Sequence, residues 1–433
     1  MTKNSIVSNT RWIVVCKIIQ SVLQLIVGVL CARYLGPHDY GLIGYASSLV
    51  AFAVPLVQLG LYATIVKELV DAPEKEGAIM GTSILLEVVS AIVCIVLVNA
   101  FSFAANANEP LTITVCAISS ISLLFKSFEL MQRWFQYKLQ SKYPSVIAVC
   151  VYVIVSAYRI YLLITEKSVH WFALVNSLEY FLMGAALIYV YYRLGAGKMS
   201  FSLPMAGHLL KKSKYYILSA VMVNVFQNTD HIMLKMMVGE AENGFYTAAV
   251  TASCVVAFLY AAIVDSMRPV IFEYKKKLDA RYEKNLSVLY CIIFYLTIAQ
   301  GVGFTLFSKL IIRILYGSEF MKAAAVLRII IWQISFSYMG TIRNIWILAE
   351  GKQHLVWKLN LCGVMVNILL NALLIPRIGA CGAAIASLAT QMFTNFVLGF
   401  CIRELKENNR LLLNGIHPKT LYNLIGEFRK SRG

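Results

Sequence analysis

Charged residues are scarce in this sequence, and acidic residues are the scarcer kind. Of 433 residues only 14% are charged, with 22 Asp and Glu against 39 Lys and Arg, while 59% are hydrophobic. Soluble domains use about 45–50% apolar and about 25% charged residues, so a water-soluble globular protein is excluded. The net charge of +17 does not indicate nucleic-acid binding, because the basic residues lie in short segments between apolar runs, as in cytoplasmic membrane loops.

The sequence also lacks the motifs of common catalytic and nucleotide-binding sites. It has no H-E-x-x-H metal-ligand cluster, no G-x-x-x-x-G-K-[ST] nucleotide loop and no D-x-D pair of the kind that many glycosyltransferases use to hold a metal. The ten cysteines are scattered, with no C-x-x-C spacing, which is typical of packing residues. We therefore expect no cofactor, no metal site and no enzymatic activity.

Long apolar runs dominate what the chain does contain. A membrane-spanning helix needs about 20 mostly apolar residues, and about twelve segments meet this requirement. They cover residues 12–32, 41–62, 78–103, 111–130, 144–164, 169–192, 215–238, 245–266, 286–308, 324–349, 355–375 and 380–402. The sequence thus predicts an all-α polytopic integral membrane protein with about twelve transmembrane helices.

The basic residues predict how these helices are oriented and grouped. Segments on the side of the two termini carry about 26 Lys and Arg, against about 6 in the opposite set, so both termini should be cytoplasmic. The basic connection 193–214 separates an N-terminal six-helix lobe, 1–192, from a C-terminal six-helix lobe, 215–402, and a basic cytoplasmic tail, 403–433, follows. Apolar residues recur at helical spacing in this tail, which is interpreted either as an amphipathic helix on the inner leaflet or as a frayed end.

An internal repeat indicates that the two lobes are pseudo-symmetric. Short turns framed by glycines follow the first and the seventh predicted spans, at 36–41 and 239–244. The shift along the chain that superposes these turns also superposes Ser21 on Asn224 and Gln24 on Gln227. The first and seventh spans are therefore corresponding helices.

Both corresponding spans carry a polar face. The side chains that recur at helical spacing are Lys17, Gln20, Ser21 and Gln24 in the first span, and Asn224, Gln227, Asn228, His231 and Lys235 in the seventh. A polar face against lipid would be costly, so both faces must point to protein or water. A single Ser or Gln in a span is more often a helix–helix hydrogen bond, but two matching faces favour a substrate cavity between the two bundles.

Further ionisable residues lie inside the predicted spans, where charges are expensive and by default indicate function. Basic ones outnumber acidic ones, so we expect a positive field in a water-filled cavity, with Arg159 and Arg343 among its lining residues. Three acidic residues, Asp230, Glu87 and Glu179, are interpreted as ion-coupling or structural charges. Asp230 lies away from the polar face of its helix, where pairing with a basic residue is favoured.

Four short segments carry a family resemblance. They lie at 32–41, 228–249, 315–328 and 367–384 and include the runs RYLGP, NTD, YGSEF and IPRIGA. In this order they resemble the Wzx-type polysaccharide repeat-unit flippases (O-antigen, capsule or exopolysaccharide) of the multidrug/oligosaccharidyl-lipid/polysaccharide (MOP) exporter superfamily. The resemblance implies alternating access around a large cationic cavity, moving an undecaprenyl-diphosphate-linked oligosaccharide from the inner to the outer leaflet of a bacterial cytoplasmic membrane. It also implies a polysaccharide polymerase and glycosyltransferases as partners.

Three alternatives are open at this point. A cation-coupled multidrug exporter of the same superfamily would favour acidic groups in its cavity, and here basic groups are in excess. A membrane-embedded polysaccharide polymerase or ligase would need a sizeable outer loop with catalytic residues, and no predicted outer connection is that long. A lipid II flippase would be expected to have additional spans.

Overall fold

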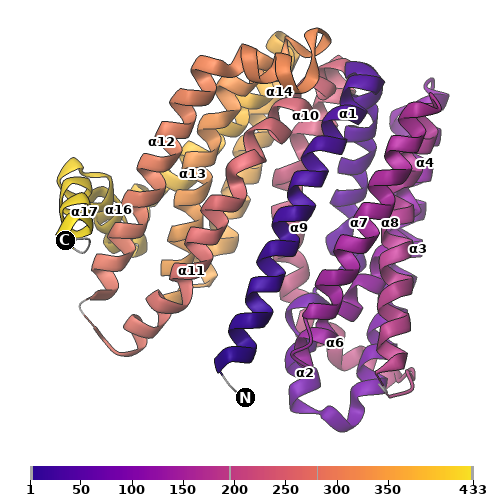
Figure 1. Cartoon of the computed structure of the whole chain (residues 1–433), viewed down its shortest axis with the longest axis horizontal. Helices are drawn as coiled ribbons and strands as arrows, with labels where there is room; N and C mark the ends of the chain where they lie inside the picture. Colours follow the sequence, from indigo (N-terminus) through magenta and orange to yellow (C-terminus); the bar gives the residue numbers. More distant parts are fainter. Residues whose placement is uncertain (1–2, 195–196, 280, 431–433) are drawn as a thin grey trace. The chain divides into compact units, whose positions relative to one another are not determined.

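The computed structural model describes residues 3–194, 197–279 and 281–430, although not every side chain within these ranges (Figure 1). The described residues form helices joined by short turns, and no strand occurs among them. Contacts divide the chain into two compact units, Met1–Met236 and Met237–Gly433. The predicted all-α fold class is confirmed.

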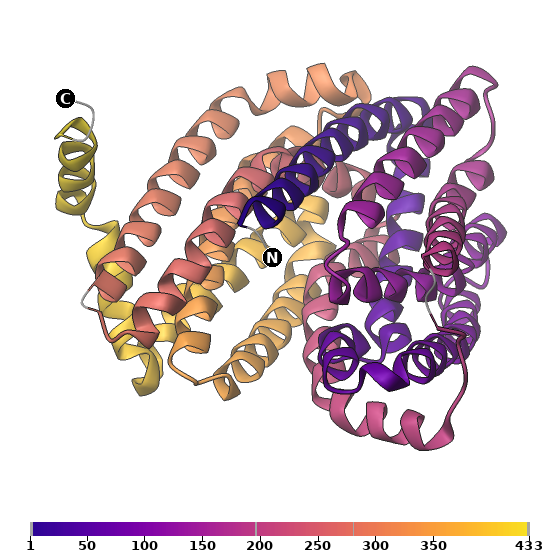
Figure 2. The ribbon, with the colours of Figure 1, turned by 60° about the horizontal axis from the view of Figure 1, so that its bottom comes forward.

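The first unit consists of helices α1 to α9 and their connections. Their bounds are α1 Lys3–Gln58, η1 Leu61–Ala63, α2 Ile65–Asp71, η2 Pro73–Lys75, α3 Glu76–Ala105, α4 Pro110–Ser120, α5 Ser122–Lys126, η3 Ser127–Leu130, α6 Met131–Tyr137, α7 Lys142–Ile164, α8 Val169–Arg193 and α9 Leu203–Val238. Helix α1 packs against α3, α4 and α7, and α8 packs against α4, α5 and α7. Figure 2 shows α3, α4, α7 and α8 as neighbouring members of one bundle.

The second unit holds the remaining helices. Their bounds are α10 Glu240–Ser253, η4 Cys254–Val256, α11 Ala257–Lys276, α12 Arg281–Tyr316, η5 Ser318–Phe320, α13 Ala323–Ala349, α14 His354–Met392, η6 Phe393–Val397, α15 Leu398–Cys401, η7 Arg403–Leu405, α16 Lys406–Ile416 and α17 Pro418–Lys430. Helix α13 lies between α12 and α14, and α16 packs on α12 (Figure 1). The tail is helical in α16 and α17, so a frayed end is excluded for 406–430.

Glycines interrupt the helical backbone at the two turns that define the repeat. Gly36 has φ 69° and ψ 175°, and Gly239 has φ 101° and ψ 176°. This region of positive φ is open to glycine but strained for residues with a Cβ. The corresponding positions of the predicted repeat therefore share one backbone conformation, and a new helical segment starts directly after each glycine.

Eight helices of the described residues are long and apolar enough to span a membrane. Two of them, Val22–Gln58 and His354–Cys401, each contain two predicted spans, separated by the breaks at Gly36 and at Gly379. The predicted spans 215–238 and 245–266 include residues whose side chains are not described, and they are not among these eight. In the second of these, the helical backbone runs from α10 through the 3₁₀ turn η4 into α11.

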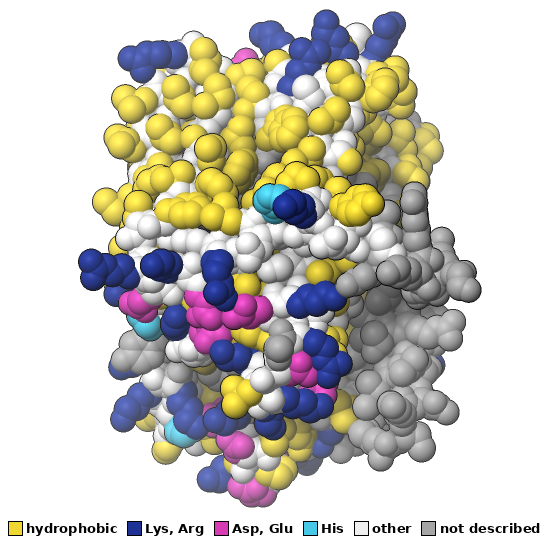
Figure 3. Space-filling view, turned by 90° about the vertical axis from the view of Figure 1, so that its left-hand side faces the viewer, with side chains coloured by type: hydrophobic (Ala, Val, Ile, Leu, Met, Phe, Trp, Pro, Cys, Tyr) yellow, Lys and Arg dark blue, Asp and Glu magenta, His cyan; other side chains and the backbone are white. Residues whose placement is uncertain are grey.

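Large apolar side chains face outward along the spans. On α12 the exposed ones are Leu296, Val302, Leu306, Phe307, Leu310 and Ile314. Figure 3 shows the side of the molecule on which α12 and α16 lie, with a continuous apolar area in its upper part and charged side chains gathered in its lower part. A soluble monomer rarely exposes so extended an apolar surface, whereas hydrocarbon requires it. This surface is that of a multi-pass membrane protein.

The predicted connection 193–214 is held tightly on the first unit. The backbone N–H of Ser200 donates to the carbonyl of Gly77 at 3.0 Å, and the N–H of Ser202 donates to Thr82 Oγ1 at 3.0 Å. A Cβ added at Gly81 would lie 2.5 Å from the Ser200 carbonyl oxygen, so only glycine permits this approach. From Leu203 onward the connection is already part of α9.

Glu68 of α2 fixes the start of α9. Its carboxylate accepts hydrogen bonds from Lys212 Nζ at 2.7 Å and pairs with His208 Nε2 at 2.9 Å. Burial raises the pKa of Glu68, but the hydrogen bonds from Lys212 and His208 outweigh it and hold that pKa below its ordinary value. Because α9 is anchored in this way, the compact units divide at 236/237 and not at the predicted lobe boundary near 215. The assignment of α9 to the C-terminal lobe stays a prediction.

Replacing Gly81 by alanine should destabilise the first unit. The new Cβ would push the Ser200 backbone away, at a cost of about 1–3 kcal/mol. Gly207→Ala is the matched control, since a Cβ there meets nothing within 4 Å, and alanine in a helix should add about 0.5–1 kcal/mol of stability. Thermal unfolding of the purified protein in detergent measures both changes, and equal melting temperatures for the two variants would contradict the close approach.

The Glu68 cluster should make stability depend on acid pH. A carboxyl whose pKa is lowered by folding stabilises the protein above its unfolded value, about 4.3, and loses this contribution as pH falls below it. The difference in melting temperature between wild type and Glu68→Gln should therefore be full at neutral pH and shrink below about pH 4. A difference that stays constant from pH 7 to pH 3 would show that the ionised carboxylate is not what anchors α9.

Candidate functional site

The polar face of the first span is only partly described. Gln24 is exposed and Gln20 is half-buried on α1, and a Cβ added at Gly28, one turn further, would meet nothing within 4 Å. The side chains of Lys17 and Ser21 lie outside the described residues. The described part of this face is therefore left open by the first unit.

The polar face of α9 combines exposed and self-bonded amides. Gln227 is exposed, and His231 is half-buried. The amides of Asn224 and Asn228 donate to the carbonyls of Ala220 and Asn224, at 3.1 and 2.9 Å, one turn back in the same helix. In these two bonds neither amide reaches a neighbouring helix.

Lys235, at the end of this face, is buried in an ion pair. Its Nζ contacts Glu109 Oε2 and Asn106 Oδ1 and lies 5.3 Å from the centre of the Tyr45 ring. The lysine side chain is 3% exposed and that of Glu109 is 46% exposed. Thr112 Oγ1 also donates to Glu109, at 2.8 Å. Lys235 is therefore neutralised in this conformation and is not an open cavity cation.

Glu109 and Asn106 were not among the residues predicted for the site. They lie in the connection between α3 and α4, and Glu109 directly precedes Pro110, the first residue of α4. The sequence marks this connection as an outer turn and nothing more. The contact with Lys235 joins residues more than a hundred positions apart, which periodicity along one helix cannot reveal.

Most other buried charges of the first unit are also paired. Arg159 of α7 lies 3.9 Å from Glu179 of α8, and Lys126 lies 3.2 Å from Glu129. Asp230 is 3% exposed and has an interaction partner, and its pairing with a basic residue stays a prediction. Glu87 of α3 differs, because its carboxylate has no hydrogen-bond partner among the described residues.

Arg343 occupies the core of the second unit. It is 4% exposed, and one guanidinium nitrogen donates to the carbonyl of Thr394 at 2.6 Å. Thr394 lies in η6, a π-helical turn, and such turns frequently occur at functional sites. The Nε atom has no partner among the described residues, and none of the described carboxylates pairs with this arginine. Since it belongs to the other unit, its distance from the polar face of α9 is not determined.

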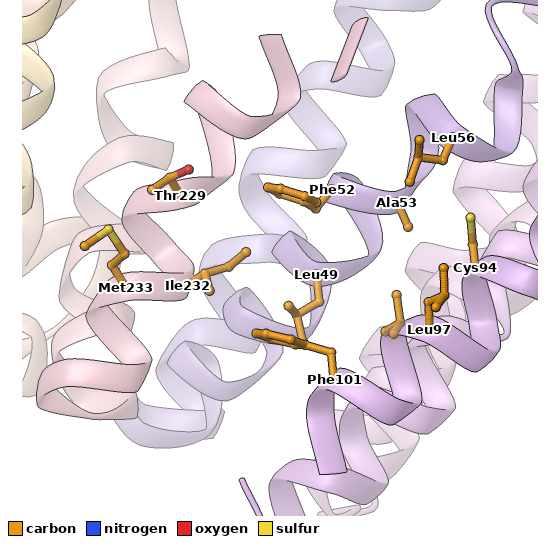
Figure 4. Close-up of a pocket in the computed structure, with 11 residues that line it drawn as sticks. Leu49, Phe52, Ala53, Leu56, Cys94, Leu97, Phe101, Thr229, Ile232 and Met233 are labelled. Carbon is orange, nitrogen blue, oxygen red and sulfur yellow. The ribbon is translucent and has the colours of Figure 1, made fainter. Parts of the chain in front are cut away.

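An apolar pocket of about 300 Å³ lies beside α9 in the first unit (Figure 4). It is lined by Leu49, Phe52, Ala53, Leu56, Cys94, Leu97, Val98, Phe101, Thr229, Ile232 and Met233. Figure 4 shows these side chains converging from α1, α3 and α9. No sequence pattern indicates this pocket, because its residues are those of any apolar span. No group of three or more His, Cys, Asp or Glu that could hold a metal occurs in the described part of the chain.

The family model of polysaccharide biosynthesis proteins matches residues 6–275, more than half of the sequence. The chain belongs to this family. It is 25% identical over 210 residues to the probable low-salt glycan biosynthesis flippase Agl15 of Haloferax volcanii, covering 47% of this chain and 44% of that protein. It is also 25% identical over 241 residues to an uncharacterized membrane protein of Methanocaldococcus jannaschii, covering 52% of this chain and 46% of that protein. The chain thus spans about half the length of the curated relatives it matches.

Solved structures show the same fold over nearly the whole chain. The lipid II flippase MurJ, in an inward closed conformation, superposes with a TM-score of 0.73 at 16% identity, over 93% of this chain and 90% of that one. An inward-facing multidrug resistance MATE family transporter of the MOP superfamily superposes with a TM-score of 0.68 at 13% identity, over 91% and 95%. The family model confirms the predicted relation to polysaccharide biosynthesis proteins, and the fold is the one that these transporters have.

The Lys235–Glu109 pair can be tested by a double-mutant cycle. Glu109→Gln leaves the buried lysine without its counter-charge and should lower stability by about 2 kcal/mol, less than for a fully buried pair because Glu109 is half-exposed. In a Lys235→Met background the same change should cost little, since no charge remains to be paired. Thermal unfolding of the four proteins in detergent gives the coupling. Equal losses in both backgrounds would mean that the ion pair does not form.

Proposed function

We propose that this protein is a flippase that moves an undecaprenyl-diphosphate-linked oligosaccharide repeat unit from the inner to the outer leaflet of the cytoplasmic membrane by alternating access, for surface polysaccharide biosynthesis. The observation that carries the proposal is the match to the polysaccharide biosynthesis family combined with a transporter fold over nearly the whole chain. The multi-pass apolar exterior agrees with it. The host membrane is proposed to be bacterial, with both termini cytoplasmic.

In this proposal the two predicted lobes face each other around the cargo. Sugars need donors and acceptors of moderate strength, which Gln20, Ser21, Gln24, Asn224, Gln227, Asn228 and His231 supply. The diphosphate needs cations, which Lys17, Arg159, Lys235 and Arg343 supply. The polyprenyl tail stays in the bilayer, since its transfer through a polar cavity would be unfavourable. Partners of the pathway are glycosyltransferases that build the cargo and a polysaccharide polymerase that consumes it.

The pairing of Lys235 suggests how the diphosphate would be bound. Glu109 is half-exposed and so can be solvated, while Lys235 is buried. A phosphate oxygen that replaces Glu109 at Lys235 Nζ exchanges one charge-assisted contact for another and leaves the carboxylate to water. Arg343 needs no such exchange, because no carboxylate of the described residues neutralises it. Asp230, Glu87 and Glu179 are proposed to be coupling or structural charges.

Transport can be measured with purified protein in liposomes that carry a fluorescent lipid-linked oligosaccharide. Lys17→Ala and Lys235→Ala should slow flipping at least several-fold while insertion and folding are retained. Lys277→Ala is the control, because this lysine is 64% exposed and pairs only within its own helix turn, with Glu273. The double variant Lys235→Ala/Glu109→Gln separates folding from transport, since it removes both charges and should stay slow.

The cargo assignment is decided by comparing lipids in the same liposomes. Undecaprenyl-diphosphate-linked oligosaccharide should be flipped, and lipid II and cationic drugs should not be transported. Drug efflux without flipping would overturn the proposal in favour of a multidrug exporter. Wild-type flipping by both lysine variants would remove these residues from the cavity without affecting the cargo assignment.

A further inference from the structure

Glu87 is a carboxylic acid in the interior of a membrane-spanning helix, fully shielded from solvent. It lies in α3 within the candidate span Pro73–Ala105, and its exposed fraction is 0%. Neither Oε1 nor Oε2 has a hydrogen-bond partner among the described residues. An ionised carboxylate without a partner at this depth would lose most of its hydration and gain nothing in return.

Three carboxylates of the first unit that are buried or half-buried differ from Glu87 in having a cation beside them. Glu68 is bound by Lys212 and His208, and Glu179 faces Arg159. Glu129 lies 3.2 Å from Lys126. These pairs permit ionised groups inside the unit. Glu87 has no such cation bound to it among the described residues. The conformation described therefore favours the neutral, protonated form of this carboxyl.

The groups that act on Glu87 come from three neighbouring elements. Glu129 in η3 and Lys126 in α5 both interact electrostatically with Glu87. Glu87 in turn interacts electrostatically with Tyr62 of η1. Lys126 is already engaged by Glu129 and by the Tyr180 hydroxyl at 2.9 Å. The Tyr62 hydroxyl is buried without a partner among the described residues. An anionic Glu87 would therefore be repelled by Glu129 and would have only a shared cation to attract it.

We propose that Glu87 is a proton-binding site and that its proton is exchanged during the transport cycle, which couples flipping to a proton gradient. This proposal rests on the proposed transport function. The exchange is a simple acid–base step: the carboxyl O–H bond breaks, the proton passes to water as hydronium, and the electron pair remains on the carboxylate. Release requires that water or Lys126 reach the carboxylate, so it occurs in a conformation other than the one described.

The protonation itself is tested without any transport assay. Infrared spectra of the purified full-length protein in detergent at neutral pH should contain a carboxylic-acid carbonyl band that is lost in Glu87→Gln. Glu166→Gln is the matched control, since Glu166 is exposed at the end of α7, and it should leave the band unchanged. An identical band in wild type and Glu87→Gln overturns the proposal. If the glutamine variant does not fold, Glu87→Met provides an apolar side chain of similar length for the same comparison.

Coupling is tested by imposing a pH gradient on the liposomes that carry the lipid-linked oligosaccharide. The gradient should accelerate flipping by wild type and Glu166→Gln, and this response should be lost in Glu87→Gln. A glutamine variant that still responds to the gradient overturns the proposal and leaves Glu87 a structural residue. If no protein flips the lipid, the proposed function fails, while the infrared band still decides whether Glu87 holds a proton.

Discussion

Every polar group that lies in hydrocarbon must find its partner inside the protein, and this constraint governs the whole molecule. Backbone groups meet it through continuous helices, so the chain can leave helical geometry only at a few points. Gly36 and Gly239 are two of them, and both stand between one helical segment and the next. Side chains meet the constraint by pairing, and some of these ion pairs join different helices, as that of Arg159 and Glu179 does.

Charge pairing also limits how many of the excess basic residues are available to bind an anion. A chain with a net charge of +17 suggests an open cationic cavity, yet Lys235 and Lys126 are each bound to a glutamate. Among the residues that the structure describes, a carboxyl in the first unit, Glu87, and a guanidinium in the second, Arg343, are exceptions. Buried groups of this kind lower stability and are kept where they serve a purpose. They are the groups on which ion coupling and anion binding can act.

Helix α9 shows that sequence repeats and compact units need not coincide. The repeat matches it with the first span, which makes it the first helix of the second lobe. Its start is nevertheless fixed by Glu68, and its end by Glu109, both of the first unit. The close approach of Ser200 to Gly81 shortens the connection before it. Because both ends of α9 are anchored there, nearly all of α9 belongs to the first compact unit.

The sequence by itself determined the features that depend on neighbouring residues. The predicted spans that lie in the eight long apolar helices, the turns at Gly36 and Gly239 and the helical tail follow from hydropathy, glycine and helical periodicity, which act over a few turns of chain. Only the tertiary structure decided that Glu109 neutralises Lys235, that Arg343 binds a π-helical turn and that an apolar pocket forms between α1, α3 and α9. It also decided that Glu87 has no hydrogen-bond partner among the described residues. These contacts join residues far apart in the chain, and a distance between side chains on different helices leaves no periodic signal along either one.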